Sequence, residues 1–131
     1  MKPITKLIIE EYNLKKIDFM GYEFTRTNAT YHHLIVPRRN GGKETFENGA
    51  VLNGKTSHPY LHIVESIDQD KFNAITNEMI IEKMIGGIDQ ECLKKIDDIL
   101  TGFERENSGK RTSKGRILIK EEYTKRTIRH I

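Results

Sequence analysis

The fold is decided by residues 32–62, which read HHLIVPRRNGGKETFENGAVLNGKTSHPYLH. The β-forming residues before this stretch lead into the apolar run 34–36, so we expect a strand or extended segment that carries His32 and His33. Four of the five histidines of the chain lie in this one stretch. Such a concentration predicts that the site of the protein is here.

A second strand and a helix are expected to follow. Two turn signals, Asn-Gly-Gly and Asn-Gly, indicate that residues 38–49 form a long loop, closed by a strand at 50–52. Ser57 as the N-cap and Pro59 in the first turn then predict a helix that starts at about His58. The stretch therefore predicts a hairpin with an oversized connection, followed by a helix.

The flanking sequence predicts mainly helices. A helix is expected over residues 4–20, and another over 68–85, stopped by two glycines. Asp89 can cap a further helix, so a helical scaffold covers about 68–106, and a short strand is expected at 117–119. The buried stripe of the last helix is formed by Cys92, Leu93, Ile96, Ile99, Leu100 and Phe103. These elements predict the α+β class.

Length and composition set the limits of the fold. A chain of 131 residues is expected to form a single domain, residues 1–131. Charged residues interrupt the apolar ones near the N-terminus, and no run reaches the roughly 18 apolar residues of a membrane span, so we expect neither a signal peptide nor a membrane anchor. A single cysteine, Cys92, excludes an internal disulfide and any Cys-Cys zinc knuckle. A cytoplasmic location fits this best.

Charge is unevenly distributed along the chain. The net charge is only +3, yet residues 108–131 hold eight lysines and arginines against two glutamates. A basic segment of this kind favours contact with a polyanion, because neutralised phosphates release counterions. The alternative is a basic tail that is merely solvated.

Two histidine pairs carry the chemistry of the predicted hairpin and helix. His58 and His62 are four residues apart, which places both imidazoles on one helical face, close enough to bind one divalent ion. The alternative is two partly exposed helix histidines. His32 and His33 are adjacent on a strand and point to opposite faces, so one can bind metal while the other does something else. Equally, one can be buried and hydrogen-bonded while the other is solvated.

The order of these residues resembles a known motif. It runs through His32-His33, Gly41-Gly42, Asn48, His58 and His62. This order and its spacing resemble the HNH (ββα-metal) endonuclease family, and are most similar to the version found in colicin-type DNases. The resemblance covers about residues 30–65 and implies a ββα-metal hairpin-helix core, with flanking helices and a basic C-terminal segment.

The resemblance also implies roles for single residues. His33 would be the general base that takes a proton from the attacking water, a task that an unliganded imidazole suits. His32, His58 and His62 would bind one divalent metal ion (Mg²⁺, Mn²⁺, Ni²⁺ or Zn²⁺), which acts as a Lewis acid on the scissile phosphate. Asn48 would brace the long loop and orient the base, although in other branches of the family this position helps to bind metal.

A nuclease needs cations around the cut phosphate. The candidates are Arg38, Arg39, Lys43 and Lys55 near the motif, with Lys110 and Arg111 in the basic segment. Arginine suits phosphate because it binds in a bidentate manner, and the alternative for these residues is a solvated loop face. The expected function is therefore a DNA endonuclease, with a possible protein partner for targeting and a phage or mobile-element origin. The alternatives are a non-catalytic, zinc-stabilised nucleic-acid-binding module and an RNase or toxin-like nuclease.

The chain departs from many HNH proteins in one respect. Those proteins enclose the motif with two Cys-x-x-Cys pairs that bind a structural zinc, and this chain has no such pairs. Asn53 and Ser57 lie about where one pair would fall. We therefore expect the hairpin to be held by packing against the flanking helices instead.

Overall fold

The computed structural model describes residues 1–109 and places an antiparallel hairpin at their centre. Strands β1 (Ala29–His33) and β2 (Gly49–Asn53) pair with Ala29 opposite Asn53 and His33 opposite Gly49. Their long connection includes a short 3-10 helix, η1 (Arg38–Asn40). The predicted hairpin with its oversized connection is thereby confirmed, whereas the strand expected at 117–119 lies outside the described residues.

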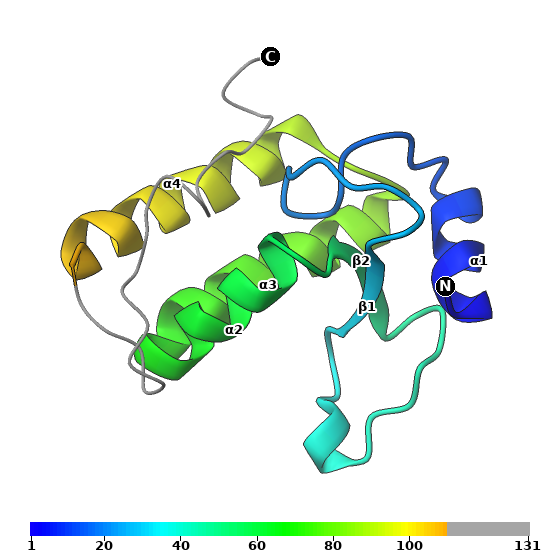
Figure 1. Ribbon diagram of the computed structural model, residues 1–131, viewed down its shortest axis with the longest axis horizontal. Helices are drawn as coiled ribbons and strands as arrows, with labels where there is room; N and C mark the ends of the chain where they lie inside the picture. Colours follow the sequence, from blue (N-terminus) through cyan, green and yellow to red (C-terminus); the bar gives the residue numbers. More distant parts are fainter. Residues whose placement is uncertain (110–131) are drawn as a thin grey trace.

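Within residues 1–109, four α-helices lie around the hairpin and make the fold of this part α+β. They are α1 (Pro3–Glu11), α2 (Ser57–Ile67), α3 (Gln69–Ile85) and α4 (Gln90–Asn107). Helices α2, α3 and α4 lie on one side of the hairpin and α1 on the other (Figure 1). None of these helices within residues 1–109 is long and apolar enough to cross a membrane.

The helix starts follow from local sequence. The side chain of Asp68 accepts a hydrogen bond from the backbone N–H of Lys71, and that of Asp89 accepts one from Cys92. Both aspartates are therefore N-caps, as the sequence predicts for Asp89, and each satisfies a donor that the first turn leaves free. Helices α3 and α4 form the expected scaffold.

Among residues 1–109, one hydrophobic core cluster joins the hairpin to the helices. A two-stranded sheet is marginal by itself, so its stability depends on this packing. The fully buried side chains are contributed by every helix, by β2 and by the segment before β1. They include Ile8, Phe19, Met20, Leu52, Leu61, Ile75, Met79, Leu93, Ile96 and Phe103.

The first helix is shorter than the sequence predicts. The expected helix over residues 4–20 is wrong beyond Glu11, because Asn13 adopts the left-handed conformation (φ 52°) and turns the chain. Asparagine tolerates this conformation better than most residues. The turn returns Leu14 and Phe19 to the core, and Ile17 then forms an isolated bridge with Glu23.

Ser57 is not the N-cap of α2, contrary to the sequence prediction. Thr56 occupies that position, and Ser57 is the first helical residue. Its hydroxyl donates to Asp18 Oδ2 (2.5 Å) and accepts from the backbone N–H of Asn53 (3.0 Å). The serine therefore ties the start of α2 to the end of β2 and to the segment before β1, through a buried carboxylate.

Three glycines shape the β1–β2 connection. Gly41 has a left-handed φ of 82°, and a Cβ on Gly42 would lie 1.9 Å from the carbonyl oxygen of Val36. These two glycines therefore allow the loop to reverse tightly. At the start of β2, a Cβ on Gly49 would lie 2.0 Å from the ring of Tyr31. Only glycine fits there unless the ring moves.

Glu82 introduces a pH dependence into the scaffold. This α3 side chain is fully buried; its Oε2 accepts from the backbone N–H of Asp89, and its Oε1 has no hydrogen-bond partner among the described residues. Burial, with lesser contributions from Asp18 and other nearby carboxylates, raises the pKa of Glu82 from 4.5 to about 9. Stability from the protonated side chain is thus complete below pH 4.5 and is lost as the pH rises through about 9.

Replacing this carboxyl by an amide should stabilise the protein at neutral and higher pH. We expect Glu82→Gln to raise the free energy of unfolding by up to about 3 kcal/mol at pH 7, and to change little at pH 4. Urea unfolding at the two pH values measures this, with the exposed Glu11→Gln as the matched control. A difference between Glu82→Gln and the parent that does not change with pH would contradict this assignment.

Candidate metal centre and cleft

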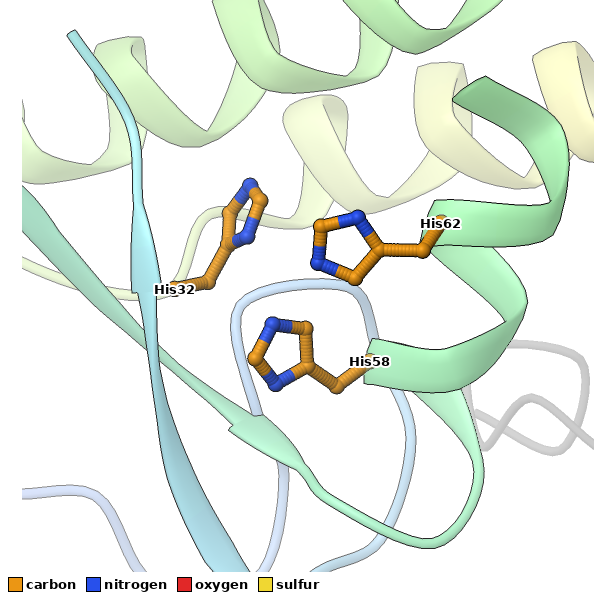
Figure 2. A group of neighbouring side chains, drawn as sticks. All are labelled: His32, His58 and His62. Carbon is orange, nitrogen blue, oxygen red and sulfur yellow. The ribbon is translucent and has the colours of Figure 1, made fainter. Parts of the chain in front are cut away.

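Three histidines from two elements converge on one point. His32 lies on β1, and His58 and His62 lie one turn apart on α2, with all three side chains turned toward one another (Figure 2). The ring centroid of His32 lies 5.2 Å from that of His58 and 5.6 Å from that of His62. The ring centroids of His58 and His62 lie 5.0 Å apart. One ring nitrogen from each residue lies within 4.8 Å of the other two. The hairpin–helix unit thus gathers the predicted ligands.

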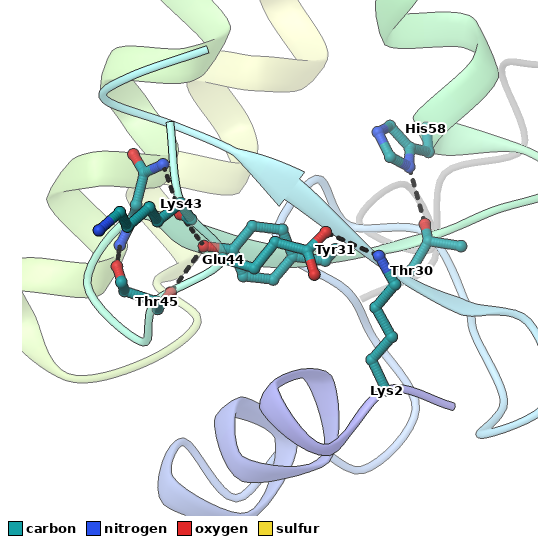
Figure 3. Close-up of polar contacts among 8 residues, drawn as sticks. Lys2, Thr30, Tyr31, Lys43, Glu44, Thr45 and His58 are labelled. Carbon is teal, nitrogen blue, oxygen red and sulfur yellow. Dashed lines mark hydrogen bonds and ion pairs between the residues drawn. The ribbon is translucent and has the colours of Figure 1, made fainter. Parts of the chain in front are cut away.

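A threonine on β1 fixes the orientation of His58. The Oγ1 atom of Thr30 lies 2.8 Å from His58 Nδ1 and 2.9 Å from the carbonyl oxygen of Leu52 (the contact with His58 is shown in Figure 3). A hydroxyl has one proton, and the carbonyl can only accept, so Thr30 donates to Leu52 and accepts from the histidine. His58 therefore carries its proton on Nδ1. Its Nε2 keeps the lone pair that a metal requires.

Burial keeps two of the three histidines neutral. His32 is 3% exposed, and its Nε2 has no hydrogen-bond partner among the described residues. Burial, followed by the neighbouring His58, His62 and His33, lowers the pKa of His32 well below its usual value. The pKa of His58 is lowered to about 4, first by burial and then by His62 and His33. Neutral imidazole is the form that binds metal.

This donor set suits a divalent metal ion. Three imidazole nitrogens on two rigid elements match the three protein ligands typical of catalytic zinc sites, which keep further positions for water or substrate. The unpartnered, buried Nε2 of His32 fits the same interpretation, because a buried polar atom ordinarily has a partner. The residues present therefore fit a metal ion.

His33 is separate from the triad but lines the same cleft. Its half-buried ring packs edge-on against Tyr31, with the centroids 5.0 Å apart, on the strand face opposite to His32. Tyr31 is in turn anchored by its hydroxyl, which donates to the carbonyl oxygen of Thr45 (Figure 3). The Nε2 atom of His33 has no hydrogen-bond partner among the described residues. The two adjacent histidines thus occupy different environments.

The cleft has a volume of about 340 Å³, and charged side chains surround its histidines. Arg38 and Arg39 come from η1, and Lys2 comes from the segment before α1. Two of these cations form ion pairs with acids: Lys2 with Glu44 at 2.7 Å (Figure 3), and Arg39 with Glu65 at 3.5 Å. Each pair includes a strongly exposed cation. An anion that enters the cleft can therefore compete for both cations.

Asn48 braces the loop that follows β1. Its Oδ1 accepts from the backbone N–H groups of Ile35 (2.8 Å) and Val36 (2.9 Å). Its Nδ2 donates to the carbonyl oxygens of Val36 (3.0 Å) and Lys43 (3.1 Å). Four hydrogen bonds occupy the buried carboxamide and hold the loop directly after His33.

The predicted nucleic-acid-binding residues fall into three groups. Arg38 and Arg39 line the cleft. Lys43 and Lys55 are exposed, on the loop and in the turn before α2, and are not among the described residues that line the cleft. Two further candidates, Lys110 and Arg111, lie outside the described residues.

Three residues of the site were missed by the sequence reasoning. Thr30 lies two residues before His32 on the same strand face, and Glu65 lies three residues after His62 on the same helix. Both spacings were available as signals. Lys2 had no local signal, because only the fold brings it next to Glu44, forty-two residues away.

No protein-family model, curated protein or solved structure matches this chain. A three-histidine candidate metal centre, built on a hairpin–helix unit, is thus defined by the geometry of its own residues.

Proposed function

We propose that the protein is a metal-dependent endonuclease of the HNH (ββα-metal) type that hydrolyses phosphodiester bonds in nucleic acid, with DNA as the leading substrate. The observation that carries this proposal is the position of His33: it lines the same cleft as the His32–His58–His62 cluster but lies on the other strand face. A metal centre and an uncommitted imidazole can together supply the Lewis acid and the general base for hydrolysis of a phosphodiester.

Each group then has a defined task. A divalent ion bound by the three histidines would supply Lewis-acid stabilisation of the negative charge on the phosphate. His33 takes the proton from the water that attacks phosphorus, as the bond to the leaving oxygen breaks. Asn48 keeps the loop after His33 rigid through its four hydrogen bonds, so that the base stays in position.

Arginines at the rim support a phosphate substrate. The guanidinium groups of Arg38 and Arg39 are exposed at the cleft, and a planar guanidinium binds phosphate oxygens in pairs. Contacts of this kind neutralise backbone charge and carry no base sequence information. We therefore propose cutting with little sequence preference, at least by this part of the chain.

The test is cleavage of a supercoiled plasmid, with a single-stranded RNA in parallel. We expect nicked and linear DNA with Mg²⁺, Mn²⁺, Ni²⁺ or Zn²⁺ and intact plasmid with EDTA. The double variant His58→Ala/His62→Ala, purified identically, should leave the plasmid intact under all conditions. Cleavage of RNA alone would reassign the substrate. Tight metal binding without any cleavage would instead favour a zinc-stabilised binding module.

A further inference from the structure

Glu65 touches two parts of the cleft at once. On α2 it follows His62 by one turn, and its Oε1 lies 3.0 Å from His62 Nδ1. Its other carboxylate oxygen, Oε2, lies 3.5 Å from a guanidinium nitrogen of Arg39. The glutamate side chain is 19% exposed, whereas those of His62 and Arg39 are 52% and 67% exposed. The partly buried carboxylate of Glu65 thus contacts both His62 and Arg39, whose side chains are more exposed than its own.

The contact with His62 decides which ring nitrogen faces the metal. An ionised carboxylate can only accept, so the proton of a neutral His62 must be on Nδ1. Its Nε2 then keeps the lone pair, as in His58, where Thr30 does the same. A carboxylate that accepts from the far nitrogen of a liganding histidine fixes the ring and increases its basicity toward the metal.

The contact with Arg39 has a different consequence. The carboxylate neutralises a guanidinium that would otherwise be available to a phosphate at the rim of the cleft. A phosphate group and Glu65 therefore compete for the same cation. Removal of the acid should free Arg39 for the substrate, and it should also lower the affinity of the three histidines for the metal ion.

We propose that Glu65 is a positioning residue. Its carboxylate orients His62 for the metal ion, and it restrains Arg39 until a phosphate takes the place of the carboxylate at the guanidinium. The proposal rests on the metal centre of the proposed function. It makes a demand that a merely structural role does not: loss of the carboxylate must weaken metal binding and must not weaken DNA binding.

Metal affinity is the first measurement. Calorimetric titration with Zn²⁺ should give roughly 10- to 100-fold weaker binding for Glu65→Ala than for the parent. Glu65→Gln should lie between the two, because its amide oxygen can still accept from Nδ1. Glu11→Gln, an exposed acid at the end of α1, should bind like the parent. If the parent binds no Zn²⁺, the proposed metal centre is wrong. If the parent binds Zn²⁺ and the Glu65 variants bind it equally well, the metal centre stands and the proposed role of Glu65 is wrong.

A spectroscopic measurement without metal separates orientation from folding. Long-range proton–nitrogen correlation spectra at about pH 8 distinguish the two neutral tautomers of a histidine. We expect His62 to be protonated on Nδ1 in the parent and to become a mixture of tautomers in Glu65→Ala, while His58 keeps its form. A His62 that is protonated mainly on Nε2 in the parent would overturn the proposal.

DNA binding in EDTA is the third measurement. Fluorescence anisotropy with a labelled duplex measures DNA affinity. We expect Glu65→Ala to bind DNA roughly twofold more tightly than the parent, and not more weakly, because one negative charge has left the cleft. Arg39→Ala should bind more weakly. Weaker binding by Glu65→Ala in both the Zn²⁺ and the DNA measurements would indicate general damage and would contradict the positioning role.

Discussion

His33→Ala is expected to lower the cleavage rate by roughly 10²- to 10⁴-fold while it leaves Zn²⁺ affinity unchanged. The side chain lies on the strand face away from the three-histidine cluster, so its removal takes no ligand from the metal. In the proposed mechanism, the group that is lost is the imidazole that removes the proton from water. Single-turnover cleavage of a labelled duplex and calorimetric Zn²⁺ titration measure the two quantities.

The matched comparison is His58→Ala, which removes a member of the cluster itself. It should lose both cleavage and tight Zn²⁺ binding, because Nε2 of this residue has no substitute. Equal cleavage by His33→Ala and the parent would show that the base is another group. Loss of Zn²⁺ binding in His33→Ala would instead show that the assignment of ligand and base between His32 and His33 is reversed.

The hairpin, α2 and the histidine cluster could be predicted because their signals are local. Strand alternation places His32 and His33 on opposite faces, and the four-residue spacing places His58 and His62 on one. The structure brings His32 together with both helix histidines. Which histidine of the strand pair joins them was implied by the resemblance and not by the spacing. Asp68 and Asp89 likewise act as caps through contacts within three residues of themselves.

Other features could not be predicted because distant residues determine them. Ser57 reads as an N-cap, but its hydroxyl is engaged by Asp18, thirty-nine residues earlier in the chain. The first helix has a favourable apolar pattern up to residue 20, yet the core needs Phe19 and Met20 in a non-helical segment. Lys2 lies at the cleft because the fold brings it next to Glu44, which is forty-two residues away in the sequence. Tertiary packing here overrides local preference.

The buried carboxylate of Asp18 is the centre of a hydrogen-bond network that joins the hairpin to α2. The backbone N–H of Asn53 and the hydroxyl of Ser57 both donate to Asp18 Oδ2 (2.9 and 2.5 Å). The other oxygen, Oδ1, accepts from the backbone N–H groups of Met20 (2.9 Å) and Tyr22 (3.0 Å). One carboxylate thus joins the segment before β1 to the end of β2 and the start of α2.

Burial and hydrogen bonding have opposite effects on the pKa of Asp18. Burial raises the pKa of Asp18 to about 6, and its hydrogen bonds with Ser57, Asn53, Tyr22 and Met20 act in the opposite direction. The side chain is therefore mainly ionised at pH 7, where four donors point at it. Its removal would strand backbone N–H groups in the core, and an unsatisfied buried donor costs about 1–3 kcal/mol.

Asp18→Ala should consequently lower the free energy of unfolding by about 4 kcal/mol at pH 7, a large part of the 5–15 kcal/mol typical of a domain. Asp18→Asn should cost less, because its amide oxygen can still accept from Met20 and Tyr22. Urea unfolding measures both, with Asp98→Asn on the exposed face of α4 as the control. If Asp18→Ala falls within about 1 kcal/mol of the parent, the hairpin is held by hydrophobic packing alone. The larger loss would mean that a hydrogen-bonded carboxylate fixes the hairpin to α2, and so sets the position of His32 relative to His58 and His62.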